Sequence, residues 1–458
     1  MLFNSLADLL LAPRDNLSVA FSAHKKITWQ QFLADIRVLI QLIKAKKCCS
    51  IAICCDDSYL FCVAFFATVY AQKKLVLPGN HQPAMLLSLA GEFDLLISDG
   101  LVKTKIVPAF ITLPIKNAQQ YKFKFSTLNL DAIDLTLFTS GSTGTPKAIK
   151  KNLLMLDTEI EALENQFGHL LGQSRIVSTV SHQHIYGLLF RVLWPLCAGR
   201  AFASTDIIYP EQVIANTTPK QILISSPALL KRLVYDGKQG NYRAVFSSGG
   251  PLSSDASDLC KQLLKQTAIE VFGSTETGGI GFRQQHETDS LWTFFPQLKT
   301  KLGSENCLAL LSPWLSKGLT ECDNNHAYYQ TSDQCELFEN QQFRLNGRID
   351  SIVKIEEKRI SLVEVEKHIN SLPWIAESVV IVITEAHRVT LGALLKLTPK
   401  GKQALASLGK GKFWIILRHA LRDWVEPVAI PRHFRITPDI PINKQGKRLA
   451  LEIAALFK

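Results

Sequence analysis

Two glycines, several hydroxyl residues and one lysine lie between Thr139 and Lys147, in the order Thr-Ser-Gly-Ser-Thr-Gly-Thr-Pro-Lys. The preceding residues 133–138 alternate in polarity, which predicts a strand. Backbone N–H groups turned inward at glycine, hydroxyl groups and an ammonium group can all donate to a phosphate. The same composition is typical of an ordinary turn, so the stretch predicts either an anion-binding loop or a plain connection.

A Walker-type phosphate loop, G-x-x-x-x-G-K-[ST], does not fit this stretch. Pro146 stands directly before Lys147, where that loop has glycine, and Ala148 follows where it has a hydroxyl residue. Proline also removes one backbone N–H donor. A nucleotide triphosphatase of the Walker class is therefore excluded.

The stretch resembles the phosphate loop of the acyl-adenylate-forming, or AMP-binding, enzymes. That family includes acyl-CoA synthetases, aryl-CoA ligases and the adenylation domains of peptide synthetases. Further family-like motifs follow in order as far as Lys447, over about two thirds of the chain. The resemblance implies that this loop binds the phosphates of ATP, through Thr139, Ser140, Gly141, Ser142, Thr143, Gly144 and Lys147.

The stretch Phe272-Gly-Ser-Thr-Glu276 resembles the family's next nucleotide motif and follows a strand predicted over residues 269–272. The resemblance implies that Phe272 stacks on the base, Thr275 contacts the α-phosphate and Glu276 holds Mg²⁺. This ion usually takes one or two carboxylates beside phosphates. Gly273 belongs to the same ATP-binding stretch. The family usually has tyrosine where Phe272 stands, so stacking is kept and a hydroxyl is lost.

Three further stretches carry ATP-binding candidates. Residues 247–252 are similar to a turn whose backbone lies against adenine, here at Gly249 and Gly250, although a plain turn looks the same. Asp333 matches a carboxylate that accepts from both ribose hydroxyls, although an isolated loop acid is more often a turn residue. Arg348 matches an arginine that contacts the nucleotide.

His184 lies three residues before Gly187 in Ser-His-Gln-His-Ile-Tyr-Gly. The family has a histidine at this spacing beside the acyl group, so the resemblance implies a catalytic role at the acyl pocket for His184. The alternative is a loop histidine with a structural hydrogen bond, and the sequence leaves both interpretations open.

The last quarter of the chain resembles the family's hinge and C-terminal catalytic segment. Asp350 matches the hinge residue, and Lys447 matches the lysine that bridges the carboxylate and the α-phosphate. Three positions depart from the family, because Ser332 and Glu357 replace glycines and Ala450 replaces an arginine. The glycine replaced by Glu357 lines the family's pantetheine tunnel, so the thiol step or its usual acceptor is in doubt.

The charge of the chain is uneven. The 458 residues carry a net charge of +11, and the segment from Gly347 onward has 19 Lys and Arg against 11 Asp and Glu. A basic domain favours acidic partners, although a solvated basic surface is the simpler explanation. The ten cysteines include no C-x-x-C pair, which argues against zinc and disulfides and for a reducing compartment. Signal-peptide and membrane-span patterns are missing, so we predict a cytoplasmic protein with no membrane span.

The pattern of elements predicts an α/β fold. Strands over 50–55 and 74–78 flank a buried helix over 59–71, which is the unit of a parallel α/β sheet. Later segments predict a helix over 151–170 and strands over 176–180, 221–225 and 243–246. The resemblance implies a large multi-sheet α/β domain over residues 1–346 and a small mobile α+β domain over residues 347–458, joined near Asp350.

The implied function is an ATP-dependent ligase that activates a small-molecule carboxylic acid as acyl-AMP and transfers it to a thiol. We favour the phosphopantetheine arm of an acyl carrier protein as acceptor, because of the basic C-terminal segment and Glu357. The compact architecture also resembles stand-alone bacterial acyl- or aryl-carrier-protein ligases. Free CoA is the alternative acceptor, and the acid is either fatty or aryl. A non-catalytic AMP-binding sensor is the alternative of another class, and no nucleic-acid partner is expected.

Overall fold

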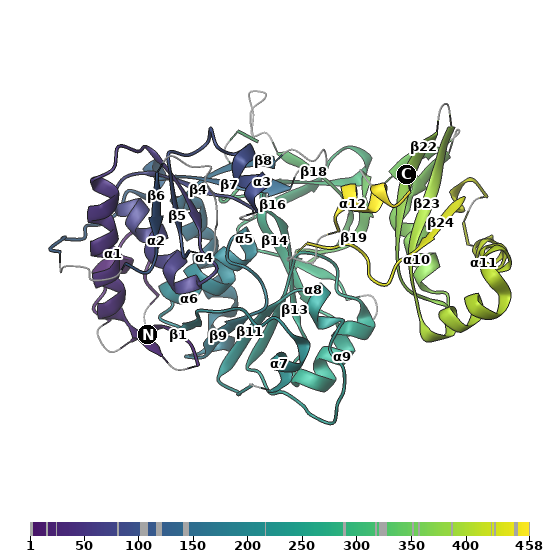
Figure 1. Ribbon diagram of the computed structural model, residues 1–458, viewed down its shortest axis with the longest axis horizontal. Helices are drawn as coiled ribbons and strands as arrows, with labels where there is room; N and C mark the ends of the chain where they lie inside the picture. The colour runs from purple at the N-terminus through teal and green to yellow at the C-terminus, as the bar shows by residue number, and fades with distance from the viewer. Residues whose placement is uncertain are drawn as a thin grey trace. The chain divides into compact units, whose positions relative to one another are not determined.

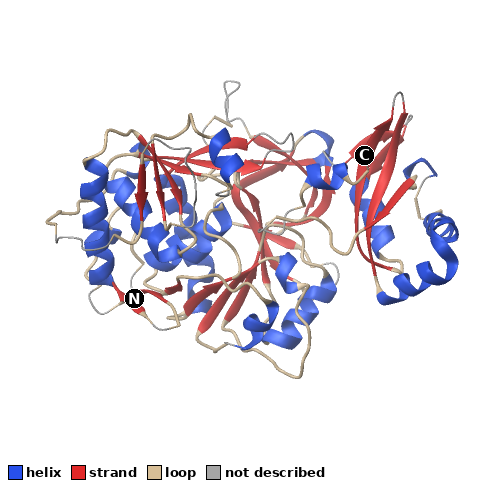
Figure 2. Cartoon of the chain, in the orientation of Figure 1, coloured by secondary structure: helices blue, strands red, loops and turns tan. Residues whose placement is uncertain are grey.

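The computed structural model, shown along the chain in Figure 1 and by secondary structure in Figure 2, contains two compact units with both helices and strands. The α/β prediction is therefore confirmed. The first unit contains described residues up to Lys299 and from Leu311 to Tyr329, and the second contains Thr300–Leu310, Gln330–Asn443 and the described residues after 447. The residues that the structure describes are 3–14, 17–23, 25–79, 82–100, 109–115, 121–140, 146–215, 217–286, 290–316, 318–319, 328–349, 352–355, 358–385, 388–422, 424–425, 427–443 and 448–457.

The contact-based units group Gln330–Asn346 with the C-terminal part of the chain. The domain boundary predicted before Gly347 stays a prediction. Asp350, the predicted hinge, lies outside the described residues.

One sheet of the first unit has the order β6-β5-β3-β4-β7-β8. Its neighbouring strands are parallel, except that β8 runs antiparallel to β7. Buried apolar residues fill β5 and most of β3, as expected for a parallel sheet covered on both faces. The strands are β3 (Ser50–Cys54), β4 (Lys74–Leu77), β5 (Leu95–Ser98), β6 (Phe110–Thr112), β7 (Asp134–Ser140) and β8 (Pro146–Asn152).

The other strands of the first unit run in the order β15-β14-β13-β12-β11-β9-β10-β1-β2. The strands β13, β12, β11, β9, β10 and β1 are parallel to one another. The outer pairs β13–β14, β14–β15 and β1–β2 are antiparallel. The strands are β1 (Ser18–Phe21), β2 (Lys26–Thr28), β9 (Arg175–Ser178), β10 (Phe202–Ala203), β11 (Gln221–Ser225), β12 (Ala244–Ser247), β13 (Ile269–Ser274), β14 (Gly278–Gln284) and β15 (Trp292–Phe294).

This topology collects the predicted motifs at one end of the parallel strands. His184 follows β9, the turn with Gly249 follows β12, and Glu276 follows β13. Open α/β sheets bind ligands beyond the carboxyl ends of their parallel strands. The fold therefore directs motifs from distant parts of the sequence toward a common edge.

The longer helices of the first unit each begin at a side chain that caps them. Thr28 Oγ1 accepts from the Gln31 N–H at 3.2 Å, as its predicted capping role requires. The helix predicted from residue 151 begins at Leu153 instead, because β8 continues to Asn152 and the Asn152 side chain then caps the helix. The helices are α1 (Trp29–Lys44), α2 (Ser58–Tyr70), α3 (Pro83–Ser88), α4 (Leu153–Leu171), α5 (Ile185–Gly187), a π-helical turn (Leu188–Leu193), α6 (Trp194–Cys197), α7 (Pro210–Ala215), α8 (Pro227–Leu230) and α9 (Ser254–Leu264).

The second unit has its own apolar core between a sheet and two helices. The order β22-β23-β24 forms this sheet, and α10 and α11 contribute Val365, Ile369, Phe413 and Leu417 to the core. A further run has the order β16-β17-β18-β19, and β20 pairs with β21 in a hairpin. The elements are β16 (Lys299–Leu302), β17 (Cys307–Leu311), β18 (Tyr329–Leu337), β19 (Gln342–Arg348), β20 (Ile352–Ile355), β21 (Lys358–Ser361), α10 (Leu362–Asn370), β22 (Ile375–Glu385), β23 (Arg388–Leu397), α11 (Pro399–Leu421), β24 (His433–Ile436) and α12 (Ala450–Ala455).

Within the described part of the chain, none of the helices has the length and hydropathy needed to cross a bilayer.

Candidate active site

The predicted phosphate loop connects two strands of a hairpin. Thr139 pairs with Lys147 across β7 and β8, and Ser140 pairs with Pro146. A strand therefore follows the loop, which agrees with the exclusion of a Walker loop, where a helix follows. The other loop candidates, Gly141, Ser142, Thr143 and Gly144, lie outside the described residues.

Lys147 and Glu276 form an ion pair. Lys147 Nζ lies 2.7 Å from Glu276 Oε1, although the two residues are 129 positions apart in the chain. The Lys147 side chain is 54% exposed and that of Glu276 is 19% exposed. Two of the separately predicted motifs therefore meet in one place.

Both members of this pair are charged. Burial tends to raise the pKa of Glu276, but the hydrogen bond and charge of Lys147 and the hydrogen bond from Ser274 outweigh it, so this pKa lies below its usual value. The hydrogen bond with Glu276 raises the pKa of Lys147. The site thus presents an ionised carboxylate beside an ammonium group.

An ionised Glu276 fits a magnesium ion that is shared with a nucleotide. Among the described residues there is no group of three or more His, Cys, Asp or Glu arranged around a metal position. A site with one carboxylate suits Mg²⁺, which keeps several waters and usually binds one or two carboxylates together with substrate phosphates. The residues present therefore fit Mg²⁺ bound with ATP rather than a dedicated metal centre.

The other residues of the Phe272–Glu276 motif lie on β13 and on the turn that follows it. The Phe272 ring is half-buried, and its centroid lies 5.7 Å from that of Trp292. Gly273 is exposed and pairs with Gly279 of β14, while Thr275 stands half-exposed beside Glu276 on the turn. An aromatic face, a hydroxyl and a carboxylate thus follow one another at a strand end.

The turn with Gly249 and Gly250 is anchored by a buried acid that sequence reasoning missed. Gly249 has φ +92°, a conformation that side chains disfavour. The Leu252 N–H donates to Glu270 Oε2 at 3.1 Å, and Glu270 also receives Arg283 Nε at 2.8 Å. Glu270 is only 2% exposed. Its position as an acid within an otherwise apolar predicted strand was the feature of the sequence that could have identified it.

The two histidines of the Ser-His-Gln-His segment differ in their surroundings. His182 is buried, with Nδ1 2.9 Å from Ser58 Oγ and Nε2 2.8 Å from the Cys55 carbonyl oxygen. His184 is half-buried and precedes α5. His182 therefore has the structural role that was the alternative for His184, and the role of His184 stays a prediction.

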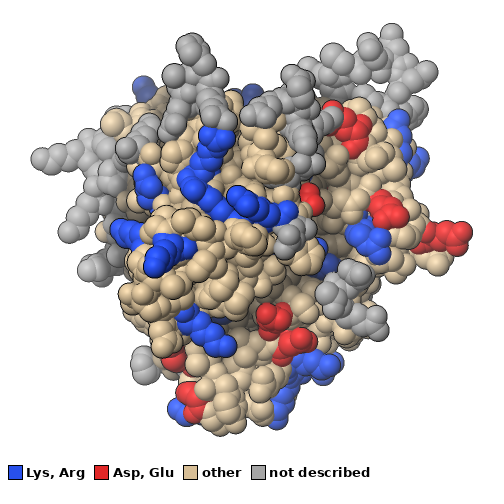
Figure 3. Space-filling model, turned by 90° about the vertical axis from the view of Figure 1, so that its right-hand side faces the viewer, with Lys and Arg blue, Asp and Glu red and all other residues tan. Residues whose placement is uncertain are grey.

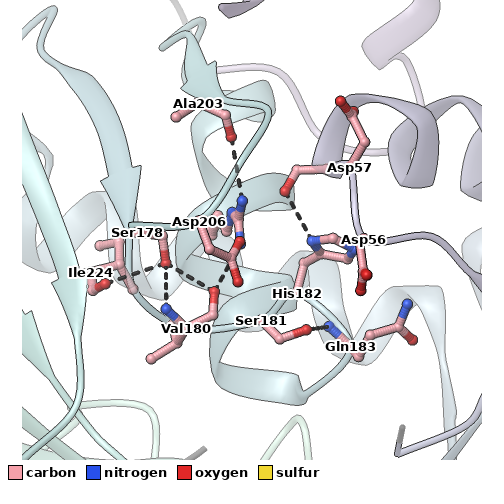
Figure 4. Close-up of polar contacts among 12 residues, drawn as sticks. Asp56, Asp57, Ser178, Val180, Ser181, His182, Gln183, Ala203, Asp206 and Ile224 are labelled. Atoms are coloured by element: carbon pink, nitrogen blue, oxygen red, sulfur yellow. Dashed lines mark hydrogen bonds and ion pairs between the residues drawn. The ribbon is translucent and has the colours of Figure 1, made fainter. Parts of the chain in front are cut away.

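Hydrogen bonds from neighbouring segments hold the chain just before His182, as the close-up in Figure 4 shows. Ser178 Oγ donates to the Val180 carbonyl at 3.0 Å and lies 3.2 Å from the Ile224 carbonyl. The buried Arg191 guanidinium donates to the same Val180 carbonyl at 2.9 Å and pairs with Asp206. These bonds fix the exit of β9 and hence the direction of the chain toward His184.

Two ATP-binding candidates of the second unit also meet. Asp333 and Arg348 are paired residues of β18 and β19, and Arg348 Nη1 lies 3.1 Å from Asp333 Oδ1. Ser332 lies within β18, and Ala450 is the first residue of α12. Glu357 and Lys447 lie outside the described residues.

Comparison with known proteins identifies the family. Residues 98–297 match the family described as AMP-binding enzyme. The 4-coumarate–CoA ligase of Halorhodospira halophila is 28% identical over 326 residues, which are 68% of this chain and 74% of that protein. The segment over residues 98–297 is therefore that of an AMP-binding enzyme, as the motifs indicated. The anthranilate–CoA ligase of Pseudomonas aeruginosa is 24% identical over 70% of this chain and 66% of its own length.

Solved structures share the fold of this chain. ATP-bound MatB from Rhodopseudomonas palustris superimposes with a TM-score of 0.82 at 17% identity, covering 100% of this chain and 99% of that chain. The o-succinylbenzoate CoA synthetase MenE from Bacillus subtilis, in complex with AMP, gives a TM-score of 0.78 at 17% identity, with 98% of each chain covered. The resemblance read from the motifs and the fold class are therefore both confirmed.

Proposed function

We propose that this AMP-binding enzyme is an AMP-forming acid–thiol ligase. The observation that carries the proposal is the ion pair of Lys147 with Glu276. An ammonium group beside an ionised carboxylate suits the proposed binding of phosphate and Mg²⁺. Family membership and the ligase activities named for the relatives support the same reaction. The substrates are a carboxylic acid, ATP and a thiol.

In the first half-reaction a carboxylate oxygen of the acid attacks the α-phosphorus of ATP, and pyrophosphate leaves. Two anions must approach each other, so catalysis depends on preorganised cations and N–H donors. Mg²⁺ supplies charge neutralisation when bound, and Glu276 is its proposed protein ligand. Lys147 and the loop from Thr139 hold the leaving phosphates, and Lys447 bridges the attacking carboxylate and the α-phosphate.

The remaining candidates position the nucleotide and the acid. Phe272 stacks on adenine, against the backbone of Gly249 and Gly250, and Asp333 accepts from the ribose hydroxyls. His184 lies beside the acyl group. These roles are proposals that rest on the family motifs.

In the second half-reaction the thiol sulfur attacks the acyl carbonyl, the bond to the AMP oxygen breaks, and the thiol proton is released. Rotation of the C-terminal domain about Asp350 separates the two steps, as domain motions do in many enzymes. We propose an acyl carrier protein as the source of the thiol. The coarser conclusion, an acid–thiol ligase, does not depend on this choice.

The surface of α11 supports a carrier protein. Its lysines Lys400, Lys402, Lys410 and Lys412 are exposed, and Ile415 is 64% exposed. A kink at Gly409 separates the first two lysines from the other two and from Ile415. On the face drawn in Figure 3 the basic side chains are interspersed with acidic ones rather than forming a uniform field. A partner is therefore recognised by local pairs between charges and apolar contacts, which favours a folded acidic protein over a diffuse polyanion.

The test of the proposed function is ATP–pyrophosphate exchange that depends on a carboxylic acid. A panel of aryl acids, including 4-coumarate and anthranilate, and of fatty acids of increasing chain length identifies the substrate class. Exchange with at least one acid, lost in Lys147→Ala and Glu276→Gln, is the expected result. Nucleotide binding without exchange for any acid would instead favour the non-catalytic AMP-binding sensor.

A further inference from the structure

A lysine and a glutamate that the motifs do not include are buried behind the Glu276 turn. Lys151 is 0% exposed and Glu159 is 4% exposed. Charged residues are rarely buried so completely unless they are paired. Neither side chain is accounted for by the reaction derived above.

Lys151 holds the main chain around Glu276. Its Nζ donates to the Trp314 carbonyl at 2.6 Å and to the Glu276 carbonyl at 3.3 Å. Lys147, which binds the Glu276 side chain, is four residues earlier on the same strand, so the two lysines share one face of β8. One strand therefore contacts Glu276 at both its carboxylate and its carbonyl group.

Glu159 holds the end of the same turn from α4. Its Oε1 accepts from the Gly279 N–H at 2.6 Å. Its Oε2 is buried and has no hydrogen-bond partner among the described residues. Burial lowers the pKa of Lys151 to about 8, and the charge of Glu159 partly opposes this shift. Burial raises the pKa of Glu159 to about 7, and the charge of Lys151 partly opposes that shift.

The segment from Ser312 to Ser316 closes the other side of the turn. Trp314 Nε1 donates to the Gly279 carbonyl at 3.0 Å. The Ser316 N–H and hydroxyl both donate to the Glu276 carbonyl at 2.9 Å. The main chain from Glu276 to Gly279 is therefore held by three separate segments.

We propose that Lys151 and Glu159 are positioning residues that fix the Glu276–Gly279 turn, so that the Glu276 carboxylate is presented to the magnesium–nucleotide complex. This inference rests on the proposed function. Such a role explains why two charges are kept where apolar residues of similar size would pack at a lower desolvation cost. It also explains why they contact the main chain of the turn rather than the ligand.

The test compares variants by their binding of nucleotide and by their stability. Lys151→Met removes the ammonium group and keeps most of the volume, and Glu159→Gln keeps an acceptor for the Gly279 N–H while removing the charge. The matched control is Glu164→Gln, because Glu164 is a carboxylate of the same helix and unit that pairs with Arg200 at 2.6 Å and does not contact the Glu276–Gly279 turn. Calorimetry measures the Kd of Mg·ATP at several magnesium concentrations, the Kd of AMP without magnesium, and the Tm.

We expect Lys151→Met to weaken Mg·ATP binding about tenfold or more and to shift its magnesium dependence to higher concentration. Loss of a residue that orients a metal ligand typically costs 10–100-fold in affinity. AMP binding should change less than about twofold, and Glu159→Gln should show a smaller shift in the same direction. Glu164→Gln should lower the Tm and leave the magnesium dependence unchanged.

Two outcomes would overturn the inference. The first is an unchanged Mg·ATP affinity in folded Glu159→Gln and Lys151→Met, even if both lower the Tm as Glu164→Gln does. The second is a wild-type chain that binds no Mg·ATP, which would also end the proposed function. A wild-type chain that binds Mg·ATP but exchanges no pyrophosphate would fail the proposed function alone, and the variants would still decide the positioning role by binding.

Discussion

At the scale of single residues, several candidate residues are charges that are held in pairs. Glu276 is paired with Lys147, and Asp333 is paired with Arg348. Partly exposed ion pairs contribute little to stability, typically about 0–1 kcal/mol. Their value is therefore preorganisation, because each pair keeps ionised groups in place for an anionic ligand.

Lys447→Ala should abolish adenylate formation and spare the thiol step when acyl-adenylate is supplied. An ammonium group that stabilises only the first transition state affects only that half-reaction. We expect a loss of about 10²–10³ in the rate of pyrophosphate exchange, as for other lost preorganised donors. Single-turnover assays of the two half-reactions measure this, and an equal loss in both would contradict the role of Lys447.

Asp333→Ala should raise the KM for ATP with a smaller effect on kcat. A ribose contact is made equally in the ground state and in the transition state, so its loss reduces binding more than chemistry. Steady-state kinetics with ATP as the varied substrate check this. An unchanged KM would show that Asp333 does not contact the ribose.

At the scale of elements, the turn between β13 and β14 is the most constrained part of the candidate site. Gly278 has φ +64°, and a Cβ there would lie 2.2 Å from Trp314 Cδ1 and 2.7 Å from Glu159 Oε2. The turn therefore needs glycine for two reasons, its backbone conformation and the side chains packed against it. Movement of this turn would displace Glu276, two residues earlier.

Gly278→Ala should destabilise the protein by more than Gly172→Ala does. Gly172 also has a positive φ, +54°, but a Cβ there meets nothing within 4 Å. The control should thus cost about 1–2 kcal/mol for backbone strain alone, and Gly278→Ala about 1–3 kcal/mol more for crowding. Urea denaturation of both variants gives these free energies, and equal values would show that the crowding is relieved without cost.

At the scale of the whole molecule, the chain divides its candidates between two units. The first unit carries Lys147, Glu276 and His184, and the second carries Asp333, Arg348 and the lysines of α11. The charge excess lies from Gly347 onward, in the part of the chain whose rotation the proposed mechanism uses. The basic surface proposed to bind the acceptor therefore belongs to the part of the chain that is proposed to move before the second half-reaction.

Charge reversal on α11 should slow transfer to a carrier protein and leave adenylation intact. Lys410→Glu with Lys412→Glu removes two exposed cations, which should reduce electrostatically steered association. Lys46→Glu with Lys47→Glu makes the same change of net charge on exposed residues of the first unit and serves as the control. The measurement is the rate of acyl transfer to holo-carrier protein and to CoA after the adenylate has formed.

A kcat/KM for CoA at or above that for every carrier protein tested would reject the carrier protein as the acceptor. The same would follow if both double variants slowed transfer equally, since the effect would then reflect net charge. Either result would leave the acid–thiol ligase with CoA as its acceptor.

Features that depend on neighbouring residues could be predicted from the sequence. Pro146 before Lys147 and Ala148 after it excluded a Walker loop. Thr28 is the cap of α1 because its side chain reaches a nearby N–H. The order of the motifs indicated the family, and alternating or continuous apolar runs located β3, β11 and α2. Such features are local, since hydrogen bonds and side-chain periodicity act over a few residues.

Which residues meet and which are buried follows from the fold and could not be predicted from the sequence. The contact of Lys147 with Glu276 joins residues 129 positions apart, and the burial of Lys151 and Glu159 depends on α4 and on the segment around Trp314. The sequence offered weak signals, a lysine on the Lys147 face of β8 and an acid on the apolar face of α4. These signals do not predict the burial of Lys151 and Glu159, because the desolvation of a charge depends on distant segments that pack around it.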